Sequence, residues 1–187
     1  MTQLTVYRDD APDLPVLQTA DAGQIAALVE TLGGRFERWP ARRELAPGAA
    51  PEVVLTAYED EIRALQQEGG YQTADVISLH GAPSNLAELR AKFLAEHTHA
   101  EDEVRFFVAG SGLFVLHAQG QVFALLCEKD DLISVPAGLQ HWFDMGPSPS
   151  FTCIRLFTDP AGWAAQYTGD GIATRFPSLG DANGPSA

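Results

Sequence analysis

The chain has 187 residues, of which 45% are hydrophobic and 20% charged, so it has enough apolar residues for one globular domain with a sizeable core. Twenty-five acidic residues against twelve Lys and Arg give a net charge of −13, which argues against binding to nucleic acid or to an anionic membrane surface. The same charge favours a self-repelling monomer. No apolar run is long enough for a transmembrane helix, and the first residues do not resemble a signal peptide. The two cysteines are too few for a disulfide framework, so we expect a cytoplasmic protein with reduced thiols.

The N-terminal part, about residues 1–95, is predicted to be mainly helical with short strands at its margins. A first helix is expected after the capping residue Asp21, because the apolar residues from Ile25 to Leu32 follow helical spacing. The segment Arg35–Pro51 contains proline and glycine and is predicted to be a loop. Two interpretations of its arginines stay open, since they can attract an anionic ligand or form a solvated face. These arginines are Arg35, Arg38, Arg42 and Arg43.

A second helix is predicted from Pro51, which suits a first helical turn, to the glycine pair that begins at Gly69. Thr73–His80 has the composition of a strand. A third helix is expected to follow Asn85, because Glu88 stands three residues later as in a capping box.

From about Glu103 the chain consists of short apolar runs separated by turn residues, a pattern typical of an antiparallel barrel or sandwich. The predicted strands are Val104–Ala109, Leu113–His117, Val122–Cys127, Leu132–Val135 and Phe151–Phe157. We expect one domain over residues 1–180, with a barrel core at about 73–158. Residues 181–187 are polar and are expected to form a flexible tail.

Three potential metal ligands lie close together in the sequence. His97, His99 and Glu103 stand at even separations, so their side chains share one face of an extended chain. His141 follows a predicted turn and can project toward them from a neighbouring strand. Imidazole and carboxylate ligands together suit a divalent ion such as iron, nickel or zinc.

The motif H-x-H-x3-E-x6-G, from His97 to Gly110, and the motif P-x-G-x2-H, from Pro136 to His141, resemble the two motifs of the cupin superfamily. The resemblance implies a mainly β fold, a double-stranded β-helix or jelly-roll barrel with a helical N-terminal layer. The chain departs from the consensus at three positions that supply no metal ligand. Glycine is replaced by Ala91 and Asp130, and asparagine by Met145.

Longer segments resemble the acireductone dioxygenase family of the methionine salvage pathway. They are Lys92–His99, Glu103–Phe106, Gly110–Phe114 and Pro136–Phe143. The resemblance implies an oxidoreductase that cleaves 1,2-dihydroxy-3-keto-5-methylthiopentene with O2. Iron enzymes of the family form 4-methylthio-2-oxobutanoate and formate, whereas nickel enzymes form 3-methylthiopropanoate, formate and carbon monoxide. Two alternatives stay open: another metal-dependent cupin dioxygenase or isomerase, and a non-catalytic cupin that binds a small molecule.

The resemblance also implies roles for individual residues. One Fe(II) or Ni(II) per chain would be held by His97, His99, Glu103 and His141, with two positions open for the substrate. Arg105 lies two residues beyond Glu103, and the family assigns this arginine to formation of the substrate dianion.

Accessory roles are implied for several neighbours. Glu96 is expected to help metal incorporation and Asp102 to relay local conformational change, although either can equally be a solvated carboxylate. Phe93, Phe143 and Trp163 are expected to wall a pocket for the methylthio tail, and ordinary core packing is the alternative.

The remaining candidates have weaker motifs. Glu101 is two residues before Glu103, so the two side chains share one face of an extended chain, and Glu101 is the alternative carboxylate ligand. His80 and His117 fit no metal motif, and His117 is expected to be a hydrogen-bonded structural histidine or a surface residue at a strand end.

Overall fold

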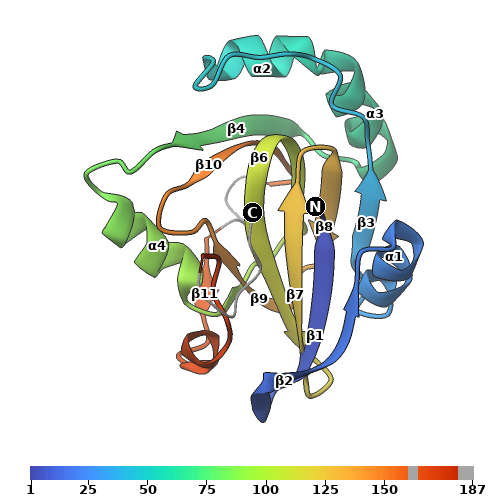
Figure 1. Ribbon diagram of the computed structural model, residues 1–187. Helices are drawn as coiled ribbons and strands as arrows, with labels where there is room; N and C mark the ends of the chain where they lie inside the picture. Colours follow the sequence, from blue (N-terminus) through green and yellow to red (C-terminus); the bar gives the residue numbers. More distant parts are fainter. Residues whose placement is uncertain (160–163, 181–187) are drawn as a thin grey trace.

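The computed structural model describes residues 1–159 and 164–180, and in it the strands form one strongly bent antiparallel sheet (Figure 1). The longest path through the sheet runs from the C-terminal strand to the N-terminal hairpin, in the order β11-β5-β9-β6-β7-β1-β2. The strands of the whole sheet are β1 (Gln3–Arg8), β2 (Ala11–Thr19), β3 (Arg35–Arg38), β4 (Thr73–His80), β5 (His97–Thr98), β6 (Glu103–Ala118), β7 (Gln121–Glu128), β8 (Asp131–Val135), β9 (Gln140–Asp144), β10 (Ser150–Phe157) and β11 (Gln166–Tyr167).

Strand β6 joins the two sides of this bent sheet. Its first half pairs with β8 and β10, and its second half pairs with β7 and β9. The prediction of two strands separated by a turn at Gly110 is therefore wrong. Gly110 instead bends one continuous strand, with a φ of +69°, and a Cβ at this position would overlap the carbonyl oxygen of Ser150.

The N-terminal hairpin adds two strands to the sheet, since β1 pairs with both β7 and β2. Arg35–Arg38 forms β3 along β8, so the prediction of a loop is wrong for these four residues. Residues 39–50 contain no helix or strand, as expected.

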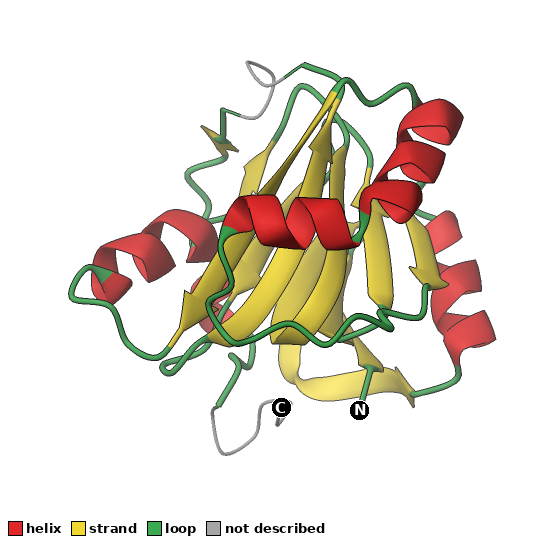
Figure 2. Ribbon diagram, turned by 90° about the horizontal axis from the view of Figure 1, so that it is seen from above, coloured by secondary structure: helices red, strands yellow, loops and turns green. Residues whose placement is uncertain are grey.

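The helices lie around the periphery of the sheet (Figure 2). They are α1 (Ala22–Glu30), α2 (Pro51–Ala57), α3 (Glu59–Gly69), α4 (Leu86–Leu94) and the short 3-10 helix η2 (Ile172–Arg175). The predicted cap of α1 is confirmed, because the Asp21 side chain accepts a hydrogen bond from the backbone of Gln24 at 2.7 Å. No helix among the described residues combines the length and apolarity needed to cross a membrane.

Two helix predictions need correction. The single helix expected after Pro51 is interrupted at Tyr58, whose buried ring packs edge-on against Phe106 with its backbone outside helical geometry. The capping box before α4 does not form, because Asn85 makes no side-chain hydrogen bond to the helix.

Alternation along β6 separates two parts of the core. Val104, Phe106 and Val108 pack in one cluster with residues of α2 and α3. Phe107 belongs to the second cluster, on the inner face of the bent sheet, together with Phe143 of β9. Side chains in β6 that are an even number of residues before Phe107 therefore also point inward.

Candidate metal centre

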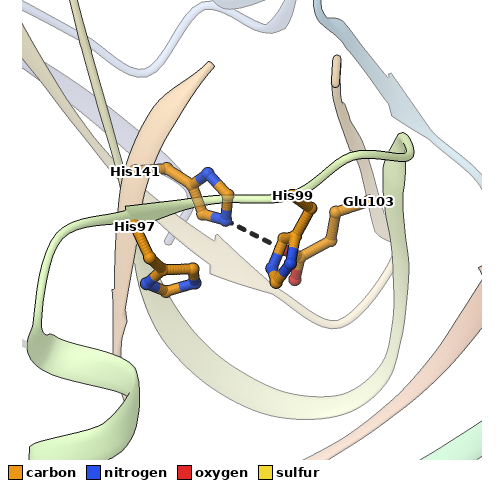
Figure 3. A group of neighbouring side chains, drawn as sticks. All are labelled: His97, His99, Glu103 and His141. Atoms are coloured by element: carbon orange, nitrogen blue, oxygen red, sulfur yellow. Dashed lines mark hydrogen bonds and ion pairs between the residues drawn. The ribbon is translucent and has the colours of Figure 1, made fainter. Parts of the chain in front are cut away.

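The four predicted ligands lie together on the inner face of the sheet (Figure 3). His97 is in β5 and pairs in register with His141 of β9, which brings these two imidazoles side by side. His99 follows β5 directly, and Glu103 begins β6. One ligand atom from each residue lies within 4.8 Å of the others, a separation that one metal ion can bridge.

Glu103 is at the centre of the contacts within this group. Its Oε2 lies 3.0 Å from Nε2 of His141 and 3.2 Å from Nε2 of His99. Its Oε1 accepts a hydrogen bond of 2.6 Å from Nε of Arg105. The four side chains are nearly inaccessible to solvent, with at most 7% of any residue exposed.

Backbone carbonyls orient two of the imidazoles. Nδ1 of His97 donates to the carbonyl oxygen of Ala95 at 2.7 Å, and Nδ1 of His141 donates to that of Leu139 at 2.8 Å. A proton on Nδ1 leaves Nε2 as the electron-pair donor of a neutral ring. Both rings are thus held in the tautomer that a metal ion at the centre of the group requires.

The electrostatics of the group favour the ligating forms of its side chains. Burial, with the neighbouring imidazoles of His141 and His99, lowers the pKa of His97 to about 4. Burial alone would raise the pKa of Glu103, but the positive charge of the Arg105 guanidinium outweighs this effect and holds the pKa of Glu103 well below its usual value. Neutral imidazole nitrogens beside a carboxylate are a donor set that suits a divalent transition metal.

Arg105 is buried beside this group, with only 3% of the residue exposed. Its guanidinium lies 4.7 Å from the ring centre of Phe143, 5.1 Å from that of Phe114 and 5.9 Å from that of Phe93. Burial disfavours its charge, but Glu103 outweighs that effect and raises the pKa of Arg105. A permanent cation is therefore fixed at the edge of the candidate metal centre.

A cavity of about 140 Å³ opens beside the histidines. It is lined by Lys92, Phe93, His97, His99, Arg105, Arg155, Ala164 and Ala165. Of the residues predicted to wall a substrate pocket, Phe93 lines this cavity, whereas Phe143 is buried against Arg105 and does not line it. The third predicted wall residue, Trp163, lies outside the described residues.

Arg155 of β10 also lines this cavity, although it belongs to none of the sequence motifs that predict the site. It lies opposite Arg105 in the register of β10 and β6 and makes two hydrogen bonds to Asp75, of 2.7 and 2.5 Å. Its position in the middle of an apolar strand is the feature that could have indicated it, because a charged side chain there needs an ion-pair partner or a functional role.

The carboxylates next to the ligands point away from the group of four. Buried Glu96 binds Nδ1 of His117 at 2.5 Å and the hydroxyl of Thr168 at 2.7 Å. The expectation that His117 is a hydrogen-bonded structural histidine is confirmed. Asp102 accepts a hydrogen bond of 2.9 Å from the backbone of Ala137, in the turn that precedes His141.

The other two candidates also have different partners. Glu101 accepts a hydrogen bond from the hydroxyl of Thr158 and is not part of the group that could hold a metal ion. His80 lies at the end of β4, where it contacts the hydroxyls of Thr152 and Ser150.

Comparisons with known proteins agree with this geometry. The model of the ARD/ARD' family matches residues 3–165. Acireductone dioxygenase of Synechococcus sp. is 57% identical over 180 residues, covering 96% of this chain and 99% of that protein. Acireductone dioxygenase of Pseudomonas paraeruginosa is 56% identical, with 97% and 100% covered. A solved structure of acireductone dioxygenase from Bacillus anthracis with a cadmium ion in its active centre superposes with a TM-score of 0.77 at 28% identity, covering 89% of this chain and 98% of that one. This chain belongs to the acireductone dioxygenase (ARD/ARD') family.

Proposed function

We propose that this protein is a metal-dependent acireductone dioxygenase of methionine salvage, which cleaves 1,2-dihydroxy-3-keto-5-methylthiopentene with O2. The observation that carries the proposal is the buried group of three imidazoles and one carboxylate in a chain that matches acireductone dioxygenases over nearly its whole length. A cavity bordered by two of these imidazoles and by Arg105 gives a small substrate a place beside the group.

The metal ion is one Fe(II) or Ni(II), held by His97, His99, Glu103 and His141. Three neutral imidazoles and one carboxylate leave a net positive charge on such a centre, which suits an anionic substrate. When bound, the ion supplies Lewis acidity and a template for two substrate oxygens. The expected products are 4-methylthio-2-oxobutanoate and formate with iron, and 3-methylthiopropanoate, formate and carbon monoxide with nickel.

Arg105 is the catalytic residue that this chain contributes besides the ligands. Acireductone must lose protons to become an electron-rich dianion, and a fixed guanidinium stabilises the negative charge that develops on its oxygens. The Nε–H of Arg105 is already used by Glu103, and the Arg105 side chain also lines the cavity, where its guanidinium can face an anionic substrate.

Other residues shape the site without reacting. Phe93 offers an apolar surface to the methylthio tail and, with Phe143, covers the Arg105 guanidinium. Glu96 and Asp102 act as positioning residues, because they tie the backbone on either side of the ligands to Thr168 and Ala137.

The test is turnover with defined metals. The purified chain is stripped of metal, loaded with Fe(II) or Ni(II), and mixed with acireductone under air while the absorbance of the enediol is followed. We expect rapid decay with either metal and the two different product sets by NMR. Decay at the rate of the protein-free control with both metals would contradict the proposed substrate.

A further inference from the structure

A second and larger cavity, of about 670 Å³, lies between the 43–49 part of the loop before α2 and the strands β4, β6 and β10. Its volume falls within the range of about 300–1,000 Å³ that is usual for small-molecule sites. Among its walls, the residues that matter for recognition are Arg43, Leu45, Val54, Val108, Lys129 and Thr152.

This cavity is separate from the metal centre. Val108 packs with the helices on the outer face of the sheet, whereas Arg105 lies against the aromatic rings of the inner face. Glu103 and Gly110 are seven residues apart along β6, a distance of roughly 23 Å in an extended strand. No described residue lines both cavities.

The walls divide into an apolar part and a cationic part. Leu45, Val54 and Val108 supply the apolar surface. Arg43 and Lys129 supply the positive charge, and neither takes part in an ion pair within the described chain, although most other arginines do. The one acidic residue in the lining is Glu44, so the side chains of Arg, Lys and Glu carry one net positive charge.

The cavity also has a polar floor. The hydroxyl of buried Thr152 lies 3.1 Å from Nε2 of His80 and 2.9 Å from the hydroxyl of Ser78. A buried hydroxyl with partners at these distances has a defined orientation, and both Thr152 and His80 line the cavity.

The loop that covers the cavity is fastened at several points. Asp130 accepts hydrogen bonds of 2.7 Å from the backbone of Trp39, through its carbonyl oxygen, and from that of Ala41, through its carboxylate. Farther along the loop, the carbonyl oxygen of Arg43 accepts a bond of 3.3 Å from the hydroxyl of Tyr58. Nε of Arg43 donates to the carbonyl oxygen of Ala57 at 3.1 Å. The loop on this side of the cavity is thus held by fixed contacts.

We propose that this cavity is a second, non-catalytic binding site for a small amphipathic monocarboxylate, such as a short-chain fatty acid or a 2-oxo acid with an apolar tail. The carboxylate lies between Arg43 and Lys129, and the tail packs against Leu45, Val54 and Val108. A single negative charge matches the single excess positive charge of the lining. The site also gives a role to Arg43, one of the loop arginines that the metal centre does not use.

The test is a titration of the ¹⁵N-labelled, metal-loaded protein with hexanoate, followed by two-dimensional NMR. We expect saturable shifts at the amides of Val108, Gly110 and Thr152, with weaker effects from 1-hexanol, which lacks the charge, and from acetate, which lacks the tail. Lys129→Gln is expected to weaken hexanoate binding by about two- to fivefold, as for a partly exposed ion pair. Ala46→Trp, at an exposed lining position, is expected to fill the cavity and abolish the shifts.

Arg63→Gln is the matched control, because Arg63 pairs with Glu59 and Asp60 on the surface of α3 and does not line the cavity. This variant is expected to bind hexanoate as the wild type does. Lys129→Gln and Ala46→Trp should keep full dioxygenase turnover, so loss of this site and loss of the proposed function are measured separately. The proposal is overturned if the cavity amides show no saturable shift, or if Lys129→Gln and Ala46→Trp both leave the hexanoate dissociation constant unchanged.

Discussion

Glu103 and Arg105 form a buried ion pair in which each residue stabilises the charge of the other. The carboxylate accepts the Arg105 Nε–H at 2.6 Å and also lies within hydrogen-bond distance of two imidazoles. Such a pair is expensive to bury, and removing one partner leaves an uncompensated charge. The arrangement is consistent with a site in which Glu103 holds a cation and Arg105 faces an anion.

Substitution of Arg105 tests its proposed part in the reaction. Arg105→Ala is expected to keep about one metal ion per chain, because the four proposed ligands remain, and to lower kcat by roughly 10²–10³-fold, the usual cost of losing one charge-stabilising donor. Metal content is measured by mass spectrometry and kcat by the decay of acireductone. Arg155→Lys serves as the comparison with Arg105→Ala, because it alters another arginine of the same cavity but keeps the positive charge there. Wild-type kcat in Arg105→Ala would contradict the role assigned to this guanidinium.

At the scale of elements, the turn between β7 and β8 shows how one departure from the cupin consensus is accommodated. Asp130 stands where the motif has glycine, and its φ of +82° is the left-handed conformation that glycine adopts without strain. Aspartate tolerates this conformation better than most residues, and its carboxylate binds the backbone of Ala41. The absence of glycine is therefore compensated by an anchor for the loop of residues 39–50.

Two substitutions of Asp130 separate the strain of its positive φ from the stabilisation by its hydrogen bond to Ala41. Asp130→Ala is expected to lower the free energy of unfolding by about 1–3 kcal/mol, because it loses the bond to Ala41 and keeps a strained φ. Asp130→Gly loses the same bond but relieves the strain, so it should be less destabilised than Asp130→Ala. Urea unfolding of the two variants checks this order, and equal midpoints would show that φ strain contributes nothing.

The bend in β6 depends on a glycine for a different reason. Gly110→Ala is expected to destabilise the protein by more than 3 kcal/mol or to prevent folding, because the new Cβ would meet backbone atoms of Ser150 rather than a side chain that can move. Gly138→Ala is the matched control, since its φ is also positive but nothing lies within 4 Å of its Cβ. It should cost only about 1–2 kcal/mol. Similar thermal midpoints for both variants would contradict the steric explanation.

Local patterns predicted some elements well and others poorly, for identifiable physical reasons. Strand β4 matches its predicted bounds, and the cap at Asp21 forms as expected. The Gly-Ser-Gly segment at residues 110–112 has the composition of a turn, and composition alone does not distinguish a turn from a bend within one strand. Strand β1 gives only a weak local signal, because it is six residues long and its alternation of polar and apolar residues ends at Tyr7.

For the whole molecule, the metal ligands were predictable whereas their surroundings were not. The spacing of His97, His99 and Glu103 placed them on one face, and a second motif located His141. The ion pair between Arg155 and Asp75 joins β10 to β4, and the contact of Asp102 joins a loop to a distant turn. These contacts depend on how strands far apart in sequence pair, and local sequence patterns contain no such information.

The pKa of His97 predicts how the stability of the metal-free protein depends on pH. Its value of about 4 in the folded state is below the ordinary 6.5, so the unfolded chain takes up the proton first as the pH falls. The contribution of His97 to the free energy of unfolding is fully present above pH 6.5. It is lost as the pH falls from 6.5 to about 4, and the total loss is about 3 kcal/mol. Urea unfolding in the presence of a chelator, at pH 7 and at pH 5, measures about 2 kcal/mol of this loss. His97→Gln should flatten this dependence, and exposed His80→Gln should not.

The central claim is that His97, His99, Glu103 and His141 together hold one divalent metal ion. The most direct measurement is X-ray absorption at the metal edge, with metal content per chain, for the Ni(II)-loaded wild type and for Glu103→Gln, His141→Ala and Glu101→Gln. We predict one nickel per wild-type chain with three imidazole ligands, loss of most of the metal in Glu103→Gln and His141→Ala, and no change in Glu101→Gln. A full complement of nickel with an unaltered absorption spectrum in both Glu103→Gln and His141→Ala would contradict the account.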